Sequence, residues 1–174
     1  MSARLKRLAV PVVSALVFVA IAALFDRDRI VGPGTLGEQE TAAVLDTLTA
    51  FNKIYQDFYA SAGSPKLIDD FPTVKRLKHF VYRDLGYLRD ADLVLVLDMA
   101  SMSLVETIRT SATTVDALVF EEWNYLYQRA ATRKPISELK GMGHGFRYSL
   151  SQVDGLWKVT AWDFLDLDPP GAAE

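Results

Sequence analysis

An uncharged stretch of 18 residues, from position 8 to position 25, constrains this chain more than any other feature. At 1.5 Å per residue a helix of that length spans about 27 Å, close to the roughly 30 Å hydrocarbon core of a bilayer. Three Lys or Arg residues precede the stretch and two follow it, which favours a cytoplasmic N-terminus. We therefore predict a single-pass anchor in the inner (cytoplasmic) membrane, with the C-terminal body on the periplasmic or otherwise extracytoplasmic side.

A cleaved signal peptide is the alternative, because Ala20-Ile21-Ala22 matches the small-residue pattern of a cleavage site. The apolar stretch continues past that site, which favours the uncleaved anchor. The expected organisation is a cytoplasmic tip and anchor (1–29), a hinge (30–35), an extracytoplasmic domain (36–168) and a flexible tail (169–174). Both alternatives place the domain outside the cytoplasm.

Charge and cysteine content exclude several classes of function. Residues 30–174 contain 14 Lys and Arg against 20 Asp and Glu, so the body is acidic. That balance argues against nucleic acid as a partner and against electrostatic adhesion to anionic lipid. The absence of cysteine excludes disulfides and thiolate chemistry.

Two segments of the body have helical periodicity. The first begins with Thr35 and Glu38 as a capping box and runs about 25 residues to Gly63-Ser64-Pro65. One apolar stripe marks its buried face: Val44, Leu48, Phe51, Tyr55, Phe58 and Ala62. The second helix is expected to be capped by Asp70, with Pro72 at its first position. Its inward face is Val74, Leu77, Val81, Leu85 and Leu88.

The period then changes from helix to strand. Residues 102–109, 115–128, 146–153 and 156–164 are predicted strands, and 93–97 fit either a strand or a helix continuation. Asp154-Gly155 predicts a tight hairpin turn, whereas 132–145, with Pro135 and three glycines, predict a loop. The fold class is α+β: an N-terminal transmembrane helix followed by a cone-like domain of two or three helices on a curved four-stranded antiparallel sheet.

The final hairpin resembles that of the nuclear-transport-factor-like (SnoaL-like) cone-fold superfamily. A pattern of the form Y-x-L…D-G-x-W-x-V is filled here by Tyr148, Leu150, Asp154, Gly155, Trp157 and Val159. The resemblance implies the cone fold. The superfamily includes small-molecule isomerases and dehydratases as well as membrane-anchored envelope scaffolds, so fold alone does not choose between enzyme and scaffold.

Candidate acid–base residues are few. His79 is expected on a solvated helix surface, and His144 lies in a glycine-rich segment. Glu121 shares a strand face with Val119 and Trp123, which would bury its carboxylate and raise its pKa. In the isomerase branch such an acid would act as a base, but we favour an ion pair with Arg147 or Lys158.

We expect no catalytic residue, no cofactor and no metal. Asp163, Asp166 and Asp168 lack the glycine turn and the bidentate Glu of a calcium loop. The favoured function is a non-catalytic interaction module, a small subunit or assembly factor of a membrane complex. The alternative is a cone-fold small-molecule-binding protein or enzyme, with an aromatic pocket lined by Phe51, Tyr55, Trp123, Tyr125, Phe146 and Tyr148.

The strands are apolar on both faces, which predicts a partner surface. Small antiparallel sheets usually have one core face and one polar face. The outer face is expected to dock onto a membrane protein complex or a second copy, through Leu118, Phe120, Leu126, Trp162 and Phe164. The alternative is that segment 132–145 or the C-terminal tail folds back over this face.

Overall fold

The structure is a computed structural model that describes Gly34 and residues 36–167. The predicted anchor at 8–25, the tail at 169–174 and the hinge other than Gly34 lie outside these residues. Gly34 accepts a hydrogen bond from the backbone N–H of Arg109, 3.0 Å away. Among the described helices none combines the length and the apolar character needed to cross a membrane.

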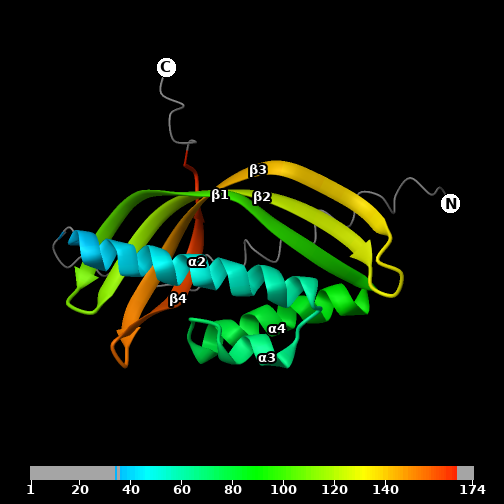
Figure 1. The fold of residues 1–174 in the computed structure, drawn as a ribbon, viewed down its shortest axis with the longest axis horizontal. Helices are drawn as coiled ribbons and strands as arrows, with labels where there is room; N and C mark the ends of the chain where they lie inside the picture. Colours follow the sequence, from blue (N-terminus) through cyan, green and yellow to red (C-terminus); the bar gives the residue numbers. More distant parts are fainter. Residues whose placement is uncertain (1–33, 35, 168–174) are drawn as a thin grey trace, which may run out of the picture.

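The described chain has an α+β architecture with the helices first and the strands after them. The helices are α2 (Glu38–Ala60), α3 (Pro65–Asp69) and α4 (Lys75–Asp90), and the strands are β1 (Leu93–Ser111), β2 (Thr114–Arg129), β3 (Pro135–Val153) and β4 (Leu156–Leu165). The strands form one antiparallel sheet in the order β1-β2-β3-β4. The sheet curves over α2, and α3 and α4 lie below one end of it (Figure 1). The predicted curved meander is confirmed.

Helix α2 carries the predicted apolar stripe on its buried side, except for Ala62, which lies beyond the end of the helix at Ala60 and is exposed. Val44, Leu48 and Phe58 are fully buried, and Phe51 is nearly so. The helix begins at Glu38 with Gly37 as N-cap and without a side-chain capping bond, so the predicted start of the helix is wrong. The proposed cap residue, Thr35, lies outside the described residues. The backbone carbonyl of Gly37 accepts the first hydrogen bond of the helix, from the backbone N–H of Thr41.

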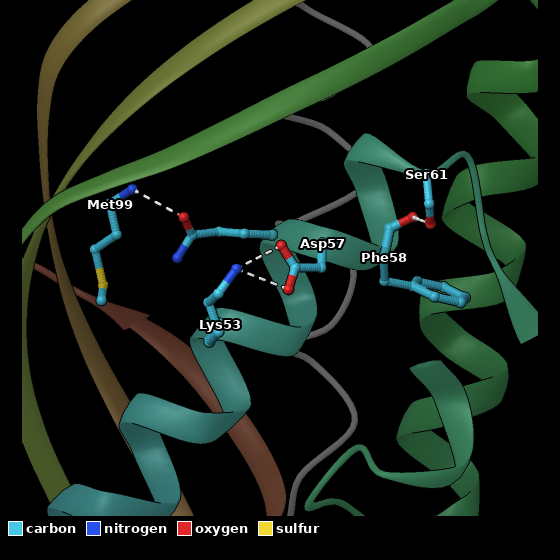
Figure 2. A network of polar contacts seen from close by, with 6 residues as sticks. Lys53, Asp57, Phe58, Ser61 and Met99 are labelled. Atoms are coloured by element: carbon cyan, nitrogen blue, oxygen red, sulfur yellow. Dashed lines mark hydrogen bonds and ion pairs between the residues drawn. The ribbon is translucent and has the colours of Figure 1, made fainter. Parts of the chain in front are cut away.

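The exposed side of α2 is held by short polar contacts (Figure 2). Lys53 and Asp57 form an ion pair one turn apart at 2.6 Å. The Oε1 atom of Gln56 lies 3.5 Å from the backbone N–H of Met99 and so links the helix to β1. Near the C-terminus the hydroxyl of Ser61 donates to the carbonyl of Phe58. Of these contacts, the one from Gln56 reaches the sheet, and the other two lie within the helix and its C-terminal turn.

Helix α4 starts later than predicted. Asp70 ends α3, and the next residues, 72–74, are extended along the edge of β4. There Val159 donates to the carbonyl of Pro72 and accepts from the N–H of Val74, so these groups cannot begin a helix. The predicted inward residues Leu77, Val81 and Leu85 are buried. The predicted buried face of α4 is therefore confirmed. Its predicted N-terminus is wrong, because pairing of residues 72–74 with β4 overrode the local helix-start signals.

Two of the predicted strand limits differ from those of the observed sheet. Residues 93–97, left open between two states, form the start of β1. The predicted loop at 132–145 is wrong, because β3 begins at Pro135 and pairs with the whole second half of β2. The last hairpin is confirmed, with φ of 55° at Asp154 and 76° at Gly155.

Glycines explain how segment 135–145 forms a strand. A Cβ atom at Gly143 would come within 2.6 Å of Cζ of Phe120, so the phenyl ring occupies the space that a side chain would need. Gly141 has φ of +61°, beside a register shift between Trp123 and Tyr125. Glycine permits this irregularity. The glycines that predicted a loop are thus accommodated within a bulged strand.

Candidate functional site

The interior of the cone, between α2 and the inner face of the sheet, is packed with aromatic side chains. The ring of Phe51 lies at its centre, 4.6 Å from the ring of Phe71, 5.6 Å from that of Trp162 and 5.8 Å from that of Tyr148. Five of the six predicted pocket-lining residues contribute rings or buried surface here, and Tyr125 packs at the margin. These residues pack against one another across the interior that they were expected to line.

Among the described residues, Glu121 is the carboxylate that is fully buried in this core. Glu121 on β2 is 0% exposed, and both of its oxygens accept hydrogen bonds. Oε1 accepts from Nδ2 of Asn52 at 2.7 Å and from the hydroxyl of Tyr148 at 3.1 Å. Oε2 accepts from Nε1 of Trp123 at 2.8 Å. We call Glu121 and these three donors the buried clasp, because they join α2, β2 and β3.

Burial raises the pKa of Glu121 above its usual value, and the hydrogen bonds from Trp123, Asn52 and Tyr148 act in the opposite direction. The predicted direction is therefore confirmed. The predicted ion pair is wrong: Arg147 faces the opposite side of the sheet and pairs with Asp163 at 2.9 Å. Neutral donors, and not a cation, satisfy the carboxylate. Each donor has a fixed place on a packed helix or strand. A substrate would have to displace one of these donors to reach the carboxylate.

Sequence reasoning missed Asn52, which is 1% exposed. It lies four residues after Leu48, within the apolar face of α2. A polar side chain at such a position needs a buried partner, and this was the signal that could have pointed to Glu121. The side chain of Asn52 also lies near two sulfur atoms, those of Met99 and Met102.

His144 pairs with Glu121 in the strand register and lies at the margin of the cone. Its ring is 5.7 Å from that of Phe164, 6.1 Å from that of Phe146 and 6.2 Å from that of Tyr125. Partial burial lowers its pKa. His79 is exposed on α4, where it was expected.

The predicted partner residues fall on two different faces. Leu118, Phe120 and Leu126 alternate with the buried residues of β2 and lie on the outer face, where they are half-buried. Leu167 covers part of this face, since a Cβ atom at Gly145 would come within 2.7 Å of its side chain. The outer face is thus partly covered by the chain's own last described residues.

Trp162 and Phe164 lie on the inner face, contrary to their predicted placement. The register between β3 and β4 shifts where Ser149 pairs with Ala161 and Leu150 pairs with Val159, so Thr160 is an extra residue. A bulge of one residue reverses the alternation of side chains beyond it. Trp162 is consequently buried against Phe51, and the ring of Phe164 lies 4.7 Å from that of Phe146 in a tilted arrangement.

No protein-family model matches the sequence, and no curated protein matches it either. Similarity is found at the level of structure. The intermembrane space region of the chloroplast protein ARC6 aligns with a TM-score of 0.61 at 14% identity, over 75% of this chain and 98% of that one.

An Ntf2-like protein involved in plasmid conjugation aligns with a TM-score of 0.51 at 13% identity. The alignment covers 78% of this chain and 52% of that protein, so this chain spans about half of its length. At such low identity the comparisons show the fold alone. The fold-level resemblance to the nuclear-transport-factor-like superfamily is confirmed.

Proposed function

We propose that this chain is a single-pass membrane protein whose extracytoplasmic cone domain is a non-catalytic interaction module, serving as a small subunit or assembly factor of a membrane complex. The anchor is residues 8–25, and the domain comprises residues 36–168. The partner is a membrane protein complex or a second copy of the chain. Localisation at the inner membrane follows from the charge bias around the anchor.

The buried clasp is the observation that carries this proposal. In an enzyme of this fold an inward carboxylate that acts as a base needs an open approach by which the substrate can reach it. Glu121 is fully buried, and its oxygens are already bonded to Asn52, Tyr148 and Trp123. Such an arrangement supports a structural role, because a satisfied buried carboxylate stabilises one packing of the elements around it.

The outer face of β2 is the proposed docking surface. Leu118, Phe120 and Leu126 line one face of a single strand, and the far end of the Phe120 ring lies next to Gly143. Half-buried apolar side chains on a sheet gain burial when another surface covers them. The two inner-face residues, Trp162 and Phe164, are removed from this surface.

The structural comparisons support the proposal. One protein with this fold is an intermembrane space region, and another is involved in plasmid conjugation. Those descriptions name a compartment between membranes and a transfer process. A module beside a membrane is therefore a setting in which this fold occurs.

The test is affinity purification of the full chain in mild detergent, followed by identification of the proteins that remain attached. The double variant Leu118→Ser/Phe120→Ser should lose the partner while keeping the circular dichroism spectrum and melting temperature close to those of the wild type. Leu156→Ser is the matched control, because Leu156 is 67% exposed at the tip of the last hairpin, away from β2.

Two results would contradict the proposal. If the double variant unfolds while the wild type is strictly monomeric and carries no partner, then Leu118 and Phe120 serve only the fold. If the control releases the same partner, binding does not use the outer face of β2.

Small-molecule binding is the second candidate, and His144 is the observation that favours it. Its half-buried imidazole faces the interior beside three aromatic rings. A ligand at this margin should protect His144 from modification by diethyl pyrocarbonate, and extraction of the native protein should release a small molecule. If His144 is modified at the same rate before and after denaturation and refolding, and no compound is released, the result would favour the interaction module over small-molecule binding.

A further inference from the structure

A small cavity lies between the C-terminus of α2, helix α4 and the start of β1, away from the buried clasp. Its volume is about 60 Å³, and its lining includes Leu85, Leu88, Leu93, Tyr82, Gly86 and Arg89. Sites for drug-sized ligands occupy roughly 300–1,000 Å³. This cavity has room for the end of one apolar side chain and for little more.

Positive charge is concentrated on α4 and on the turn at 129–134, which border this cavity, although the domain as a whole is acidic. Residues 36–167 contain 14 Lys and Arg against 18 Asp and Glu. Helix α4 and the turn at 129–134 together supply eight of the 14 basic residues and only two of the acidic ones, Asp84 and Asp90. The carboxylate of Asp84 accepts a hydrogen bond from Tyr59, so its charge is turned toward the interior.

The basic turn lies directly beside the cavity. Arg133 donates to the carbonyl of Ala60 at 3.2 Å, two residues before lining residue Ala62. Ala130 donates to the carbonyl of Asp92, next to lining residue Leu93. Arg129 lies 3.9 Å from the carboxylate of Asp92, which partly offsets its charge. The cavity is therefore a recess lined by both apolar and polar groups, and the three arginines beside it, Arg89, Arg129 and Arg133, outnumber the neighbouring carboxylates of Asp90 and Asp92.

We infer that this recess binds an acidic segment of a partner protein, which inserts one apolar side chain between α2 and α4 while its carboxylates meet Arg89 and the turn at 129–134. An apolar anchor in a pocket surrounded by charge complementarity is the usual form of a small, specific protein contact. This inference rests on the proposed role as an interaction module, but it uses a different face from the outer side of β2.

Gly86 allows a sharp test, because it lies on α4 and opens onto the recess. A Cβ atom at this position has no neighbour within 4 Å, so a larger side chain enters free space. Gly86→Leu should fill the recess, and replacing a helical glycine should preserve or raise the melting temperature. The variant thus separates lost binding from lost folding.

The probes are three fluorescein-labelled nonapeptides, titrated by anisotropy against the full chain in mild detergent. One has four acidic residues on each side of a central Leu, one has the same flanks with a central Ser, and one has lysine flanks with a central Leu. The acidic Leu peptide should bind about tenfold more tightly than the other two, since one apolar group in a pocket is worth roughly that factor. Added salt should weaken its binding.

Matched variants locate the contact. Gly86→Leu should weaken binding of the acidic Leu peptide at least tenfold, whereas His79→Leu, seven residues earlier on the same exposed side of α4, should leave it unchanged. Arg89→Gln should weaken binding severalfold, and Lys158→Gln on β4 should not. Since the chain has no cysteine, a fluorophore attached through His79→Cys reports on α4 alone.

Each contrary result is distinct. Equal binding of the Leu and Ser peptides, or wild-type binding by Gly86→Leu, would overturn the recess as the site. If the peptides fail to bind and the His79→Cys fluorophore shifts only with anionic vesicles, the basic face contacts lipid and the inference is wrong. A partner that stays with Gly86→Leu but is lost from Leu118→Ser/Phe120→Ser would overturn this inference and leave the proposed function standing.

Discussion

The side-chain amide of Asn52 donates a 2.7 Å hydrogen bond to Oε1 of Glu121, although the two residues are 69 positions apart in the chain. The bond joins the middle of α2 to the middle of β2 inside the aromatic core. With Tyr148 and Trp123 it compensates a carboxylate that would otherwise be costly to bury. The stability of the cone therefore depends on a polar contact at its most buried point.

Replacement of Asn52 by Ala should lower the free energy of unfolding by about 1.5–3 kcal/mol, the range for a hydrogen bond to a charged group. Urea unfolding measures this directly. Gln56→Ala on the same helix is the control, because its 3.5 Å contact with Met99 is longer and half-exposed. Equal losses in the two variants would mean that the buried clasp contributes no more than a surface contact.

The pH dependence of stability should report on Glu121. Burial raises its pKa in the folded state above the ordinary value of 4.5, so folding favours the protonated acid. Its favourable contribution is present below pH 4.5 and is lost as the pH rises through the folded-state pKa. Relative to Glu121→Gln, the wild type should lose stability as the pH increases from about 4.5.

Burial also raises the pKa of Asp84. Both proteins retain Asp84, so its contribution cancels when their stabilities are compared. Chemical unfolding between pH 4 and pH 8 provides the measurement. Parallel stability curves over this range would show that the carboxylate of Glu121 titrates alike in the folded and unfolded states.

Two glycines of β3 should differ in their tolerance of a methyl group. A Cβ at Gly145 would lie 2.7 Å from the backbone carbonyl of Leu165, whereas one at Gly143 would meet only the far end of the Phe120 ring. We expect Gly145→Ala to cost about 2–3 kcal/mol and Gly143→Ala about 1 kcal/mol, since a ring can move and a paired strand cannot. Thermal unfolding tests this order.

The double variant Gly143→Ala/Phe120→Ala completes the cycle. Removal of the ring should cancel most of the cost of the new methyl group, so the two effects should not add. Additive losses would show that Phe120 does not lie over Gly143.

Trp162 and Phe164 should respond differently to truncation. Trp162 is 6% exposed and packs on Phe51, whereas Phe164 is 39% exposed. Trp162→Ala should destabilise the domain by about 3–5 kcal/mol, as expected for a large core residue, and Phe164→Ala by clearly less. A mild effect of Trp162→Ala would restore this residue to the outer face and contradict the bulge at Thr160.

Membrane attachment gives a further prediction about residues 8–25. The full chain should remain in the membrane pellet after alkaline carbonate washing, and protease added from the extracytoplasmic side should reach its C-terminus. A mature product that lacks the first 22 residues and appears in the wash would instead establish the cleaved signal peptide.

The sequence alone determined the order of elements, the buried faces of α2 and α4 and the Asp154-Gly155 turn. These features depend on local patterns, namely apolar spacing and the φ values that a turn requires. The same patterns placed Glu121 on one strand face with Val119 and Trp123. In each case the determining groups lie within a few residues of one another.

Only the tertiary structure decided the remaining features, because they arise between segments distant in sequence. The strand that begins at Pro135 forms because β2 supplies its hydrogen bonds, and the N-terminus of α4 is delayed because Val159 captures residues 72–74. One extra residue, Thr160, moved Trp162 to the inner face. Asn52, and not Arg147, satisfies Glu121 because the packing of α2 on the sheet brings an amide, and no cation, to that point.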